Sequence, residues 1–310
     1  MTKQRTTQTT AQPTPPPSAP PTIHATTRPS WRPTRHHARP SLYTELTAAE
    51  ADDYAASYDG WSVFARYYQS RLMAVTAQLD AVPGGDLLDV GCGPGRMLSH
   101  LLTTRADRFR LTGLDQSEAM VHVAEGHLAQ TPGIDFVVAP AEAMPLPDAR
   151  FDAVLAMGVL EYTNLEPALR EIARVTRPGG LVVVTMLNPF SPWRLFDWGV
   201  YAPARRLLGR LEALAGVPAE RRHGAARSGI RARTPRTLCR SLRRQGLEPV
   251  DVVHYDRTVL VPPVDRLVRR VDRRWWYHPE STIGRGWPAR VTGTAYLVAA
   301  RRWGMHGVSA

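Results

Sequence analysis

Five short apolar runs alternate with longer amphipathic stretches between residues 86 and 187. Runs of this length are typical of strands that are buried on both faces of a parallel sheet. In the stretches between them, apolar residues recur at helical spacing. The alternation predicts a doubly wound, Rossmann-like α/β domain with a mostly parallel sheet and helices on both faces. The expected strands are 86–90, 110–115, 134–139, 151–157 and 180–186, and the expected helices are 96–104, 117–130 and 166–176.

The pattern changes on both sides of this core. Helical spacing with many aromatic residues precedes it, and an arginine- and aromatic-rich stretch without strand character follows the fifth strand. A helix then begins at the N-cap Thr234 and ends at Gly246, before strands 247–256 and 293–302, one of which is antiparallel. We therefore expect a tail at 1–42, a helical lid at 43–80, the core at 81–187, a helical or irregular insertion at 188–233, and the rest of the sheet at 234–310 with a further insertion at 257–292.

The first 42 residues consist mainly of Thr, Pro, Gln and Arg, with few aliphatic side chains. Such a segment cannot bury enough apolar surface to offset the entropy of ordering it, so we expect a disordered and dispensable tail. Its basic, hydroxyl-rich composition also resembles that of a transit peptide, which leaves a targeting role as the alternative.

The formal charge of the chain is +11, and every basic residue except Lys3 is arginine. Arginine enrichment of this kind is typical of GC-rich coding sequence, and the basic residues before Glu45 leave only +5 for the remainder. The charge alone therefore does not indicate an acidic partner. No apolar window is long enough to span a bilayer, and Cys92 and Cys239 lie in unrelated contexts, so we expect a soluble cytoplasmic protein.

The turn after the first strand, LLDVGCGPGRM at 87–97, is rich in glycine. Glycine lets backbone groups approach a ligand without an intervening Cβ, and parallel sheets bind ligands where a strand meets its helix. Asp89 could hold a cationic group there, and Asp115, at the end of the second strand, could accept hydrogen bonds from both hydroxyls of a ribose. The dinucleotide motif has a third glycine where this chain has Arg96, so a different nucleoside ligand is predicted.

Four segments occur in order along the chain: LLDVGCGPG, LTGLDQSEAM, PAEAMPLPDARFDAV and EIARVTRPGG. They resemble the motifs of class I S-adenosylmethionine-dependent methyltransferases, in particular the small-molecule branch that includes ubiquinone/menaquinone and biotin-pathway enzymes. The resemblance covers residues 50–187 and, more weakly, the last strands. It implies S-adenosylmethionine (SAM) as the cofactor and methyl transfer to a small molecule by in-line displacement. No cluster of metal ligands occurs in the sequence, and no metal is expected.

The resemblance also assigns cofactor-binding roles to individual residues. Arg66 or Arg71 is the expected partner of the methionine carboxylate, while the alternative for the lid is that its aromatic residues only pack on the sheet. Relatives often carry Asp or Asn where this chain has Pro140, so adenine recognition would rest on backbone groups or on Glu142. The assigned residues are Asp89, Gly91, Gly93 and Gly95 for the methionine part, Asp115 for the ribose, Gln116, Ala141 and Glu142 for the adenine, Met157 near the sulfonium, and Tyr58 in the lid at the methionine end.

A catalytic base is required only if the acceptor must lose a proton. The candidates are Glu161 and Tyr162, which follow the fourth strand, and His254 in the sixth; relatives often carry His at the position of Tyr162. Each has a structural alternative: the first two could cap or pack the next helix, and a lone histidine in a strand is commonly a hydrogen-bonded structural residue. Oxygen, nitrogen and carbon all remain open as the accepting atom.

The insertion at 188–233 favours an apolar, aromatic or lipid-like acceptor, because its aromatic residues would form a wide apolar cover over the site. Its arginines also fit an acidic carrier protein or a membrane surface. One alternative is a nucleic-acid methyltransferase that uses the basic segment 205–244, although GVLEY stands where the NPPY-type motif of that class would be. A non-catalytic SAM-binding protein is another. No oligomeric state is predicted.

Overall fold

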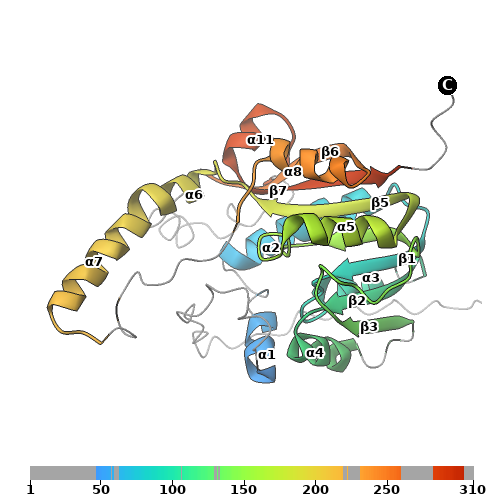
Figure 1. Ribbon diagram of the computed structural model, residues 1–310, viewed down its shortest axis with the longest axis horizontal. Helices are drawn as coiled ribbons and strands as arrows, with labels where there is room; N and C mark the ends of the chain where they lie inside the picture. The colour runs from blue at the N-terminus through green and yellow to red at the C-terminus, as the bar shows by residue number, and fades with distance from the viewer. Residues whose placement is uncertain are drawn as a thin grey trace, which may run out of the picture. The chain divides into compact units, whose positions relative to one another are not determined.

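Seven strands form one sheet in the computed structural model, in the order β3-β2-β1-β4-β5-β7-β6 (Figure 1). β7 runs antiparallel to both of its neighbours, and the other neighbouring pairs are parallel. The expected Rossmann-like sheet with one antiparallel strand is therefore confirmed. The strands are β1 Gly85–Val90, β2 Phe109–Asp115, β3 Ile134–Val138, β4 Phe151–Ala156, β5 Thr176–Leu187, β6 Leu247–Arg257 and β7 Gly293–Arg302.

The structure describes residues 47–56, 58, 63–105, 107–128, 131, 133–218, 222, 231–259 and 282–303. All of them belong to the unit Pro33–Ala310. The expected tail at 1–42 lies outside the described residues, as do residues 223–230 and 260–281 of the two expected insertions. Within the described part of the chain, no helix has the length and apolar character needed to cross a bilayer.

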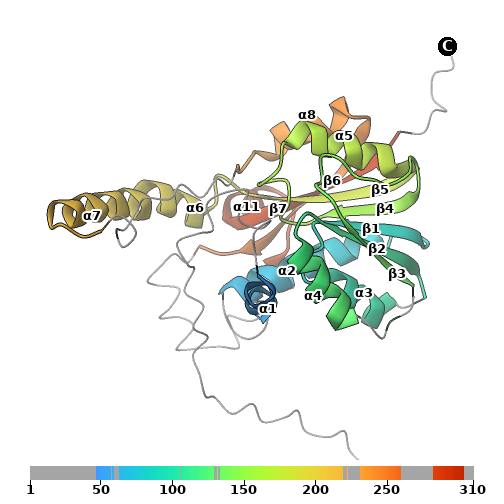
Figure 2. The same cartoon turned by 60° about the horizontal axis from the view of Figure 1, so that its bottom comes forward.

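Helices cover both faces of the sheet (Figure 2). α2 and α3 pack on one face, against Leu87 of β1 and Leu155 of β4, whereas α5 and α8 pack on the other, against Leu88 and Val154. Neighbouring residues of each central strand thus enter different cores, which accounts for the nearly continuous apolar runs in the sequence. The helices are α1 Ala48–Ala56, α2 Val63–Leu79, α3 Arg96–Arg105, α4 Glu118–Leu128, α5 Leu165–Val175 and α8 Pro235–Arg244.

β5 begins earlier than the sequence pattern indicates. Thr176 pairs with Phe151 and Leu181 pairs with Ala153, so the RPGG sequence at 177–180 bulges out within the strand. Gly179 supplies the positive φ of 79° that this bulge requires. Within the insertion expected at 257–292, residues Trp287–Thr292 form the short helix α11.

The insertion after β5 is helical in its first half. α6 Pro192–Phe196, the π-helix η2 Asp197–Tyr201 and α7 Ala202–Leu214 follow one another without a break. None of their residues is buried, and α7 extends away from the sheet in both views (Figures 1 and 2). The expectation that the aromatic residues of the insertion cover the site stays a prediction.

Candidate functional site

The residues assigned to cofactor binding follow the carboxyl ends of neighbouring parallel strands. Asp89 lies near the end of β1, Asp115 ends β2, and Met157 follows β4 directly. β1 pairs with both β2 and β4 in parallel, so these three ends lie at one edge of the sheet. This is the edge at which open α/β sheets bind their ligands.

The three glycines of the turn have different surroundings, although each has a positive φ. A Cβ on Gly91 would lie 2.1 Å from Cγ2 of Val159, and a Cβ on Gly95 would lie 3.1 Å from Cβ of Ala124. These two glycines therefore let the turn pack against the loop after β4 and against α4. A Cβ on Gly93 would meet nothing within 4 Å, so Gly93 borders open space and is the position where a ligand can approach the backbone.

The N–H groups of the turn are already used within the protein. Gly91 and Cys92 both donate to one carbonyl oxygen of β2, at 2.6 and 3.0 Å, and Gly95 donates to the carbonyl oxygen of Cys92 at 3.1 Å. Gly93 donates to Oδ2 of Asp115 at 2.9 Å. The turn thus satisfies its own donors and offers a ligand its carbonyl oxygens and the space beside Gly93. Cofactor binding at the three glycines stays a prediction.

Asp115 is held in place by backbone donors on both carboxylate oxygens. Oδ2 accepts from Gly93, and Oδ1 accepts from the N–H of Ser117 at 2.9 Å. Burial raises the pKa of Asp115, and these backbone hydrogen bonds oppose the rise. The carboxylate predicted to bind a ribose therefore has a fixed orientation next to the open space at Gly93.

Asp89 is a buried carboxylate, only 1% exposed. Burial raises its pKa to about 7, the nearby Arg71 opposes this rise, and the negative charge of Asp115 adds to it. Oδ2 of Asp89 has no hydrogen-bond partner among the described residues. A buried oxygen without a donor is unfavourable, and a cationic ligand group at this place would satisfy it.

Arg66 and Arg71, the two arginines expected near the methionine carboxylate, differ in their partners. Nη2 of Arg66 lies 2.8 Å from Oδ1 of Asp256 in a buried ion pair. Arg71 instead places its guanidinium over two tyrosine rings of its own helix, at 5.4 and 5.3 Å, and its buried Nε has no hydrogen-bond partner among the described residues. Its Nη1 would lie 2.6 Å from a Cβ on Gly158, so Arg71 reaches the loop after β4.

The aromatic residues of the lid pack against one another beside the glycine turn. The ring centroid of Tyr58 lies 4.1 Å from that of Tyr68 and 5.1 Å from that of Phe64. Arg96, the first residue of α3, donates from Nη2 to the carbonyl oxygen of Ala55 at 2.8 Å, which joins α1 to the helix that follows the turn. These rings therefore pack against one another. A contact of Tyr58 with the methionine end of the cofactor stays a prediction.

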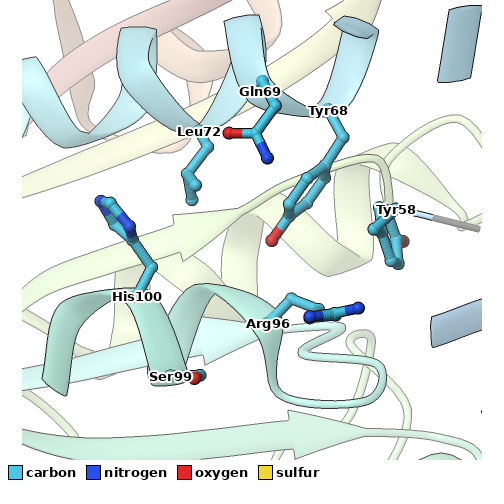
Figure 3. A pocket seen from close by; sticks show the side chains of 7 residues that line it. All are labelled: Tyr58, Tyr68, Gln69, Leu72, Arg96, Ser99 and His100. Atoms are coloured by element: carbon cyan, nitrogen blue, oxygen red, sulfur yellow. The ribbon is translucent and has the colours of Figure 1, made fainter. Parts of the chain in front are cut away.

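A small pocket of about 160 Å³ lies between α2 and α3 (Figure 3). Tyr68 and Leu72 from α2 face Arg96 and His100 from α3 across it. Its volume is below the roughly 300–1,000 Å³ that is typical of small-molecule sites, and neither Asp89 nor Asp115 lines it. We therefore interpret it as a packing gap next to the site. Its lining residues are Tyr58, Tyr68, Gln69, Leu72, Arg96, Ser99 and His100.

The residues assigned to the adenine lie in the loops after β2 and β3. Gln116 is half-buried and Ala141 is buried. The N–H of Ala139 donates to the carbonyl oxygen of Asp115 at 2.9 Å, which holds the two loops together. Oε1 of Glu142 accepts from the N–H of Asn164 at 2.8 Å, so this carboxylate is tied to the start of α5. Adenine recognition by these residues stays a prediction.

Glu161 lies at the root of the insertion that follows β5. Its Oε1 accepts from the N–H of Leu187 at 3.0 Å, and its carbonyl oxygen accepts from the N–H of Arg231 at 3.1 Å. The side chain is 2% exposed, and burial raises its pKa to about 7 against the effects of its hydrogen bonds and of Arg71. Oε2 has no hydrogen-bond partner among the described residues. Glu161 thus has the pKa and the unpaired oxygen expected of a group that exchanges a proton near neutral pH.

The other two candidate bases differ from Glu161. His254 is buried against the ring of Tyr296, with centroids 5.6 Å apart, and burial together with Arg290 lowers its pKa to about 4. A histidine with this pKa is neutral and weakly basic at physiological pH. Tyr162 is half-buried in the turn after β4, where its N–H donates to Val159 at 2.9 Å. A catalytic role for either residue stays a prediction. Within the described ranges, no group of three potential ligands could hold a metal ion.

Several residues near the site were not singled out from the sequence. The hydroxyl of Tyr67 lies 3.3 Å from that of Tyr255, which links α2 to the end of β6. Nδ2 of Asn188 donates to the carbonyl oxygens of Arg290 and Gly293, each at 2.9 Å, and so fixes the start of the insertion. These partners lie about a hundred residues or more apart, and no local pattern in the sequence links them.

Comparison with known proteins finds a match to a family model over part of the chain. Residues 88–184 match a family model described as a methyltransferase domain. The chain is 36% identical over 170 residues to a malonyl-acyl-carrier-protein O-methyltransferase of Pseudescherichia vulneris, covering 52% of this chain and 64% of the relative. It is 36% identical over 152 residues to a demethylmenaquinone methyltransferase of Renibacterium salmoninarum, covering 47% and 62%. In both cases the match spans less than two thirds of the relative's length.

A solved structure shares the fold. The SAM-dependent methyltransferase of Thermotoga maritima, described as a possible histamine N-methyltransferase, aligns with a TM-score of 0.53 and covers 84% of this chain and 99% of its own. At 19% sequence identity, this likeness concerns the fold alone.

Proposed function

We propose that this chain, which belongs to the small-molecule branch of the class I SAM-dependent methyltransferases, transfers a methyl group from SAM to a small-molecule acceptor. Its cofactor is SAM. The observation that carries the proposal is the open space at Gly93 together with the buried carboxylate of Asp89 and the fixed carboxylate of Asp115, at one edge of the sheet. A nucleoside that also carries an ammonium group would use both carboxylates.

Two buried residues of the site carry charges that suit this cofactor. Oδ2 of Asp89 is a buried acceptor without a donor, which suits an ammonium group, and the buried guanidinium of Arg71 suits a carboxylate. SAM, when bound, supplies a methyl group that is already activated by its sulfonium. The protein has to hold the acceptor in line with that methyl group and to exclude water, and such positioning can lower a barrier by about 7–11 kcal/mol.

Within this proposal, Glu161 faces the acceptor. Its unpaired Oε2 can accept a proton or a hydrogen bond, while its Oε1 is held by Leu187 at the end of β5. An acceptor that must lose a proton would use Glu161 as the base, and one that need not would use it as an anchor. In both cases the loop after β4 brings the carboxylate to the cofactor edge of the sheet.

The proposed acceptor is apolar, aromatic or lipid-like. The support lies in the exposed aromatic and leucine residues of the insertion, which begins directly beside Glu161. The named substrates of the two relatives, a malonyl carrier protein and a demethylmenaquinone, differ in kind, so an acidic carrier protein is the second candidate partner. We place the enzyme in the cytoplasm, where its two free cysteines would stay reduced.

The test is turnover of SAM with a panel of aromatic, quinone and fatty-acid acceptors. We expect conversion of SAM to S-adenosylhomocysteine and an acceptor that gains one methyl group in a mass spectrum. Arg71→Gln should raise the KM for SAM, whereas Arg170→Gln, an exposed arginine on α5, should not. SAM binding without turnover on any acceptor class would instead support a non-catalytic SAM-binding protein.

A further inference from the structure

The helical segment 192–214, formed by α6, η2 and α7, presents a stripe of leucines to solvent. Leu207, Leu211 and Leu214 are 59%, 54% and 85% exposed. Positions spaced by four and then three residues lie on the same face of an α-helix. Leu208 lies beside them, and Val200 and Ala204 continue the stripe toward η2. An apolar face of this length on the outside of a folded protein indicates a binding surface.

Arginines border the leucine stripe. At 3.6 residues per turn, Arg206 and Arg210 fall on one flank of the stripe, and Arg205 falls on the other flank beyond Leu208. The whole insertion at 188–233 contains nine arginines and three acidic residues, a net charge of +6. The helical segment 192–214 itself contains four of these arginines and two of the acidic residues, a net charge of +2.

Aromatic residues occupy the first two turns of the segment. Trp193, Trp198 and Tyr201 are all exposed. The guanidinium carbon of Arg194 lies 5.9 Å from the ring centroid of Trp198, and that of Arg205 lies 5.6 Å from the ring centroid of Tyr201. Tryptophan and tyrosine favour the boundary between water and lipid, because their rings are apolar and their N–H and O–H groups are polar.

We propose that the segment 192–214 docks on an anionic lipid surface, with its leucine stripe at the boundary of the acyl chains and its arginines at the phosphates. An amphipathic helix with leucines on one face, arginines on its flanks and interfacial aromatic residues has the composition of helices that lie in the plane of a membrane. A second copy of this chain would fit less well, because pairing of the leucine stripes would bring the flanking arginines together. An acidic carrier protein would match the arginines but not the leucine stripe.

The segment is anchored where the acceptor is proposed to bind. The N–H of Leu187, directly before the insertion, and the N–H of Arg231, near its end, both donate to Glu161. A docked segment would therefore hold this edge of the sheet close to the lipid surface, from which an amphiphilic acceptor could enter. This consequence rests on the proposed function, whereas docking itself does not.

The test is co-sedimentation of the full chain with vesicles of phosphatidylcholine alone and of phosphatidylcholine with about one third phosphatidylglycerol. We expect binding to the anionic vesicles, with Leu207→Asp/Leu211→Asp weakening it by more than about tenfold. Arg206→Gln/Arg210→Gln should weaken it by about tenfold and reduce its dependence on salt. Val250→Asp changes an apolar residue of similar exposure on β6 and should leave binding unchanged.

SAM binding by calorimetry, measured on each variant, shows whether the fold is intact and separates docking from the proposed activity. Absence of vesicle binding, or equal binding by the wild type and the Leu207→Asp/Leu211→Asp variant, would overturn the proposal. The proposal would also be overturned if sedimentation without lipid detected a dimer and the same double substitution dissociated it. That result would identify a second copy of the chain as the partner of the leucine stripe. The proposal would also be overturned, in favour of a carrier protein, if an acidic carrier protein bound this segment and the vesicles did not compete with it.

Discussion

Asp89 and Glu161 are both buried carboxylates. In each of them one oxygen has no hydrogen-bond donor among the described residues. Burial raises the pKa of each to about 7. Arg71 lowers both pKa values, so a single guanidinium acts on the carboxylate proposed to bind the cofactor and on the one proposed to face the acceptor. Raised carboxyl pKa values of this kind are typical of binding and catalytic positions, because structural carboxylates are usually paired.

The raised pKa of Asp89 predicts a pH-dependent affinity for SAM. An ammonium group binds the carboxylate and not the carboxylic acid, so the affinity should fall by up to about tenfold per pH unit below pH 7. Calorimetry between pH 6 and 8 measures this slope. Asp89→Asn should bind more weakly and lose the slope, whereas Asp107→Asn, on the surface before β2, should keep both. A slope that survives in Asp89→Asn would assign it to another group.

We expect substitution of Asp115 to weaken SAM binding without unfolding the protein. Removal of its carboxylate in Asp115→Ala deletes the proposed ribose contacts and also frees the N–H of Gly93. SAM binding should weaken by about 1.5–3 kcal/mol, the range for hydrogen bonds to charged groups. Asp135→Ala, on the exposed side of β3, is the matched control. Unchanged affinity in a calorimetric titration of Asp115→Ala would remove Asp115 from the site.

At the scale of elements, the glycines in the turn between β1 and α3 have different roles. Gly91 and Gly95 make room for Val159 and for α4, whereas Gly93 borders the open space that we propose for a ligand. The lid is fixed to the same turn, because Arg96 at the start of α3 donates to the last turn of α1. One strand-to-helix connection therefore contacts both Asp115, the proposed ribose ligand, and the expected lid.

This division predicts opposite results for two similar glycine substitutions. Gly93→Val and Gly179→Val both place a branched side chain at a positive φ with no atom within 4 Å of the new Cβ, so similar strain is expected. Gly93→Val should abolish SAM binding, because the side chain fills the proposed ligand space, and Gly179→Val, in the bulge of β5, should not. Thermal unfolding of both variants provides the control. Retained SAM binding in folded Gly93→Val would contradict the site.

At the scale of the whole molecule, the buried carboxylates make the free protein less stable at higher pH. The pKa of Glu161 rises from its ordinary 4.5 to about 7 on folding. The folded state therefore binds more protons than the unfolded state between these values. This contribution to stability is complete below pH 4.5 and is lost as the pH rises through 7. Because each pKa unit corresponds to about 1.4 kcal/mol, the free energy of unfolding falls by about 3 kcal/mol over this whole pH range.

Glu161→Gln tests this linkage, since the amide stays neutral and its oxygen can still accept from Leu187. The difference in free energy of unfolding between the variant and the wild type should shift in favour of the variant by about 2–3 kcal/mol as the pH rises from 5 to 8. Denaturant unfolding at both pH values measures the gain. Glu118→Gln, on the exposed surface of α4, should show none. Parallel stability profiles for Glu161→Gln and the wild type would show that Glu161 is not held as a buried carboxyl group.

The sequence by itself determined the order and type of the core elements, because burial on both faces of a parallel sheet produces apolar runs that can be recognised locally. It also placed Asp89, Asp115 and the glycines at strand ends, and strand ends of parallel neighbours share one edge. Only the tertiary structure showed that Arg66 is paired with Asp256, far along the chain, which favours Arg71 as the proposed partner of the methionine carboxylate. It also decided which glycine faces open space and that α7 leaves its leucines exposed. These outcomes depend on contacts between distant segments, which a local pattern of apolar and polar residues does not record.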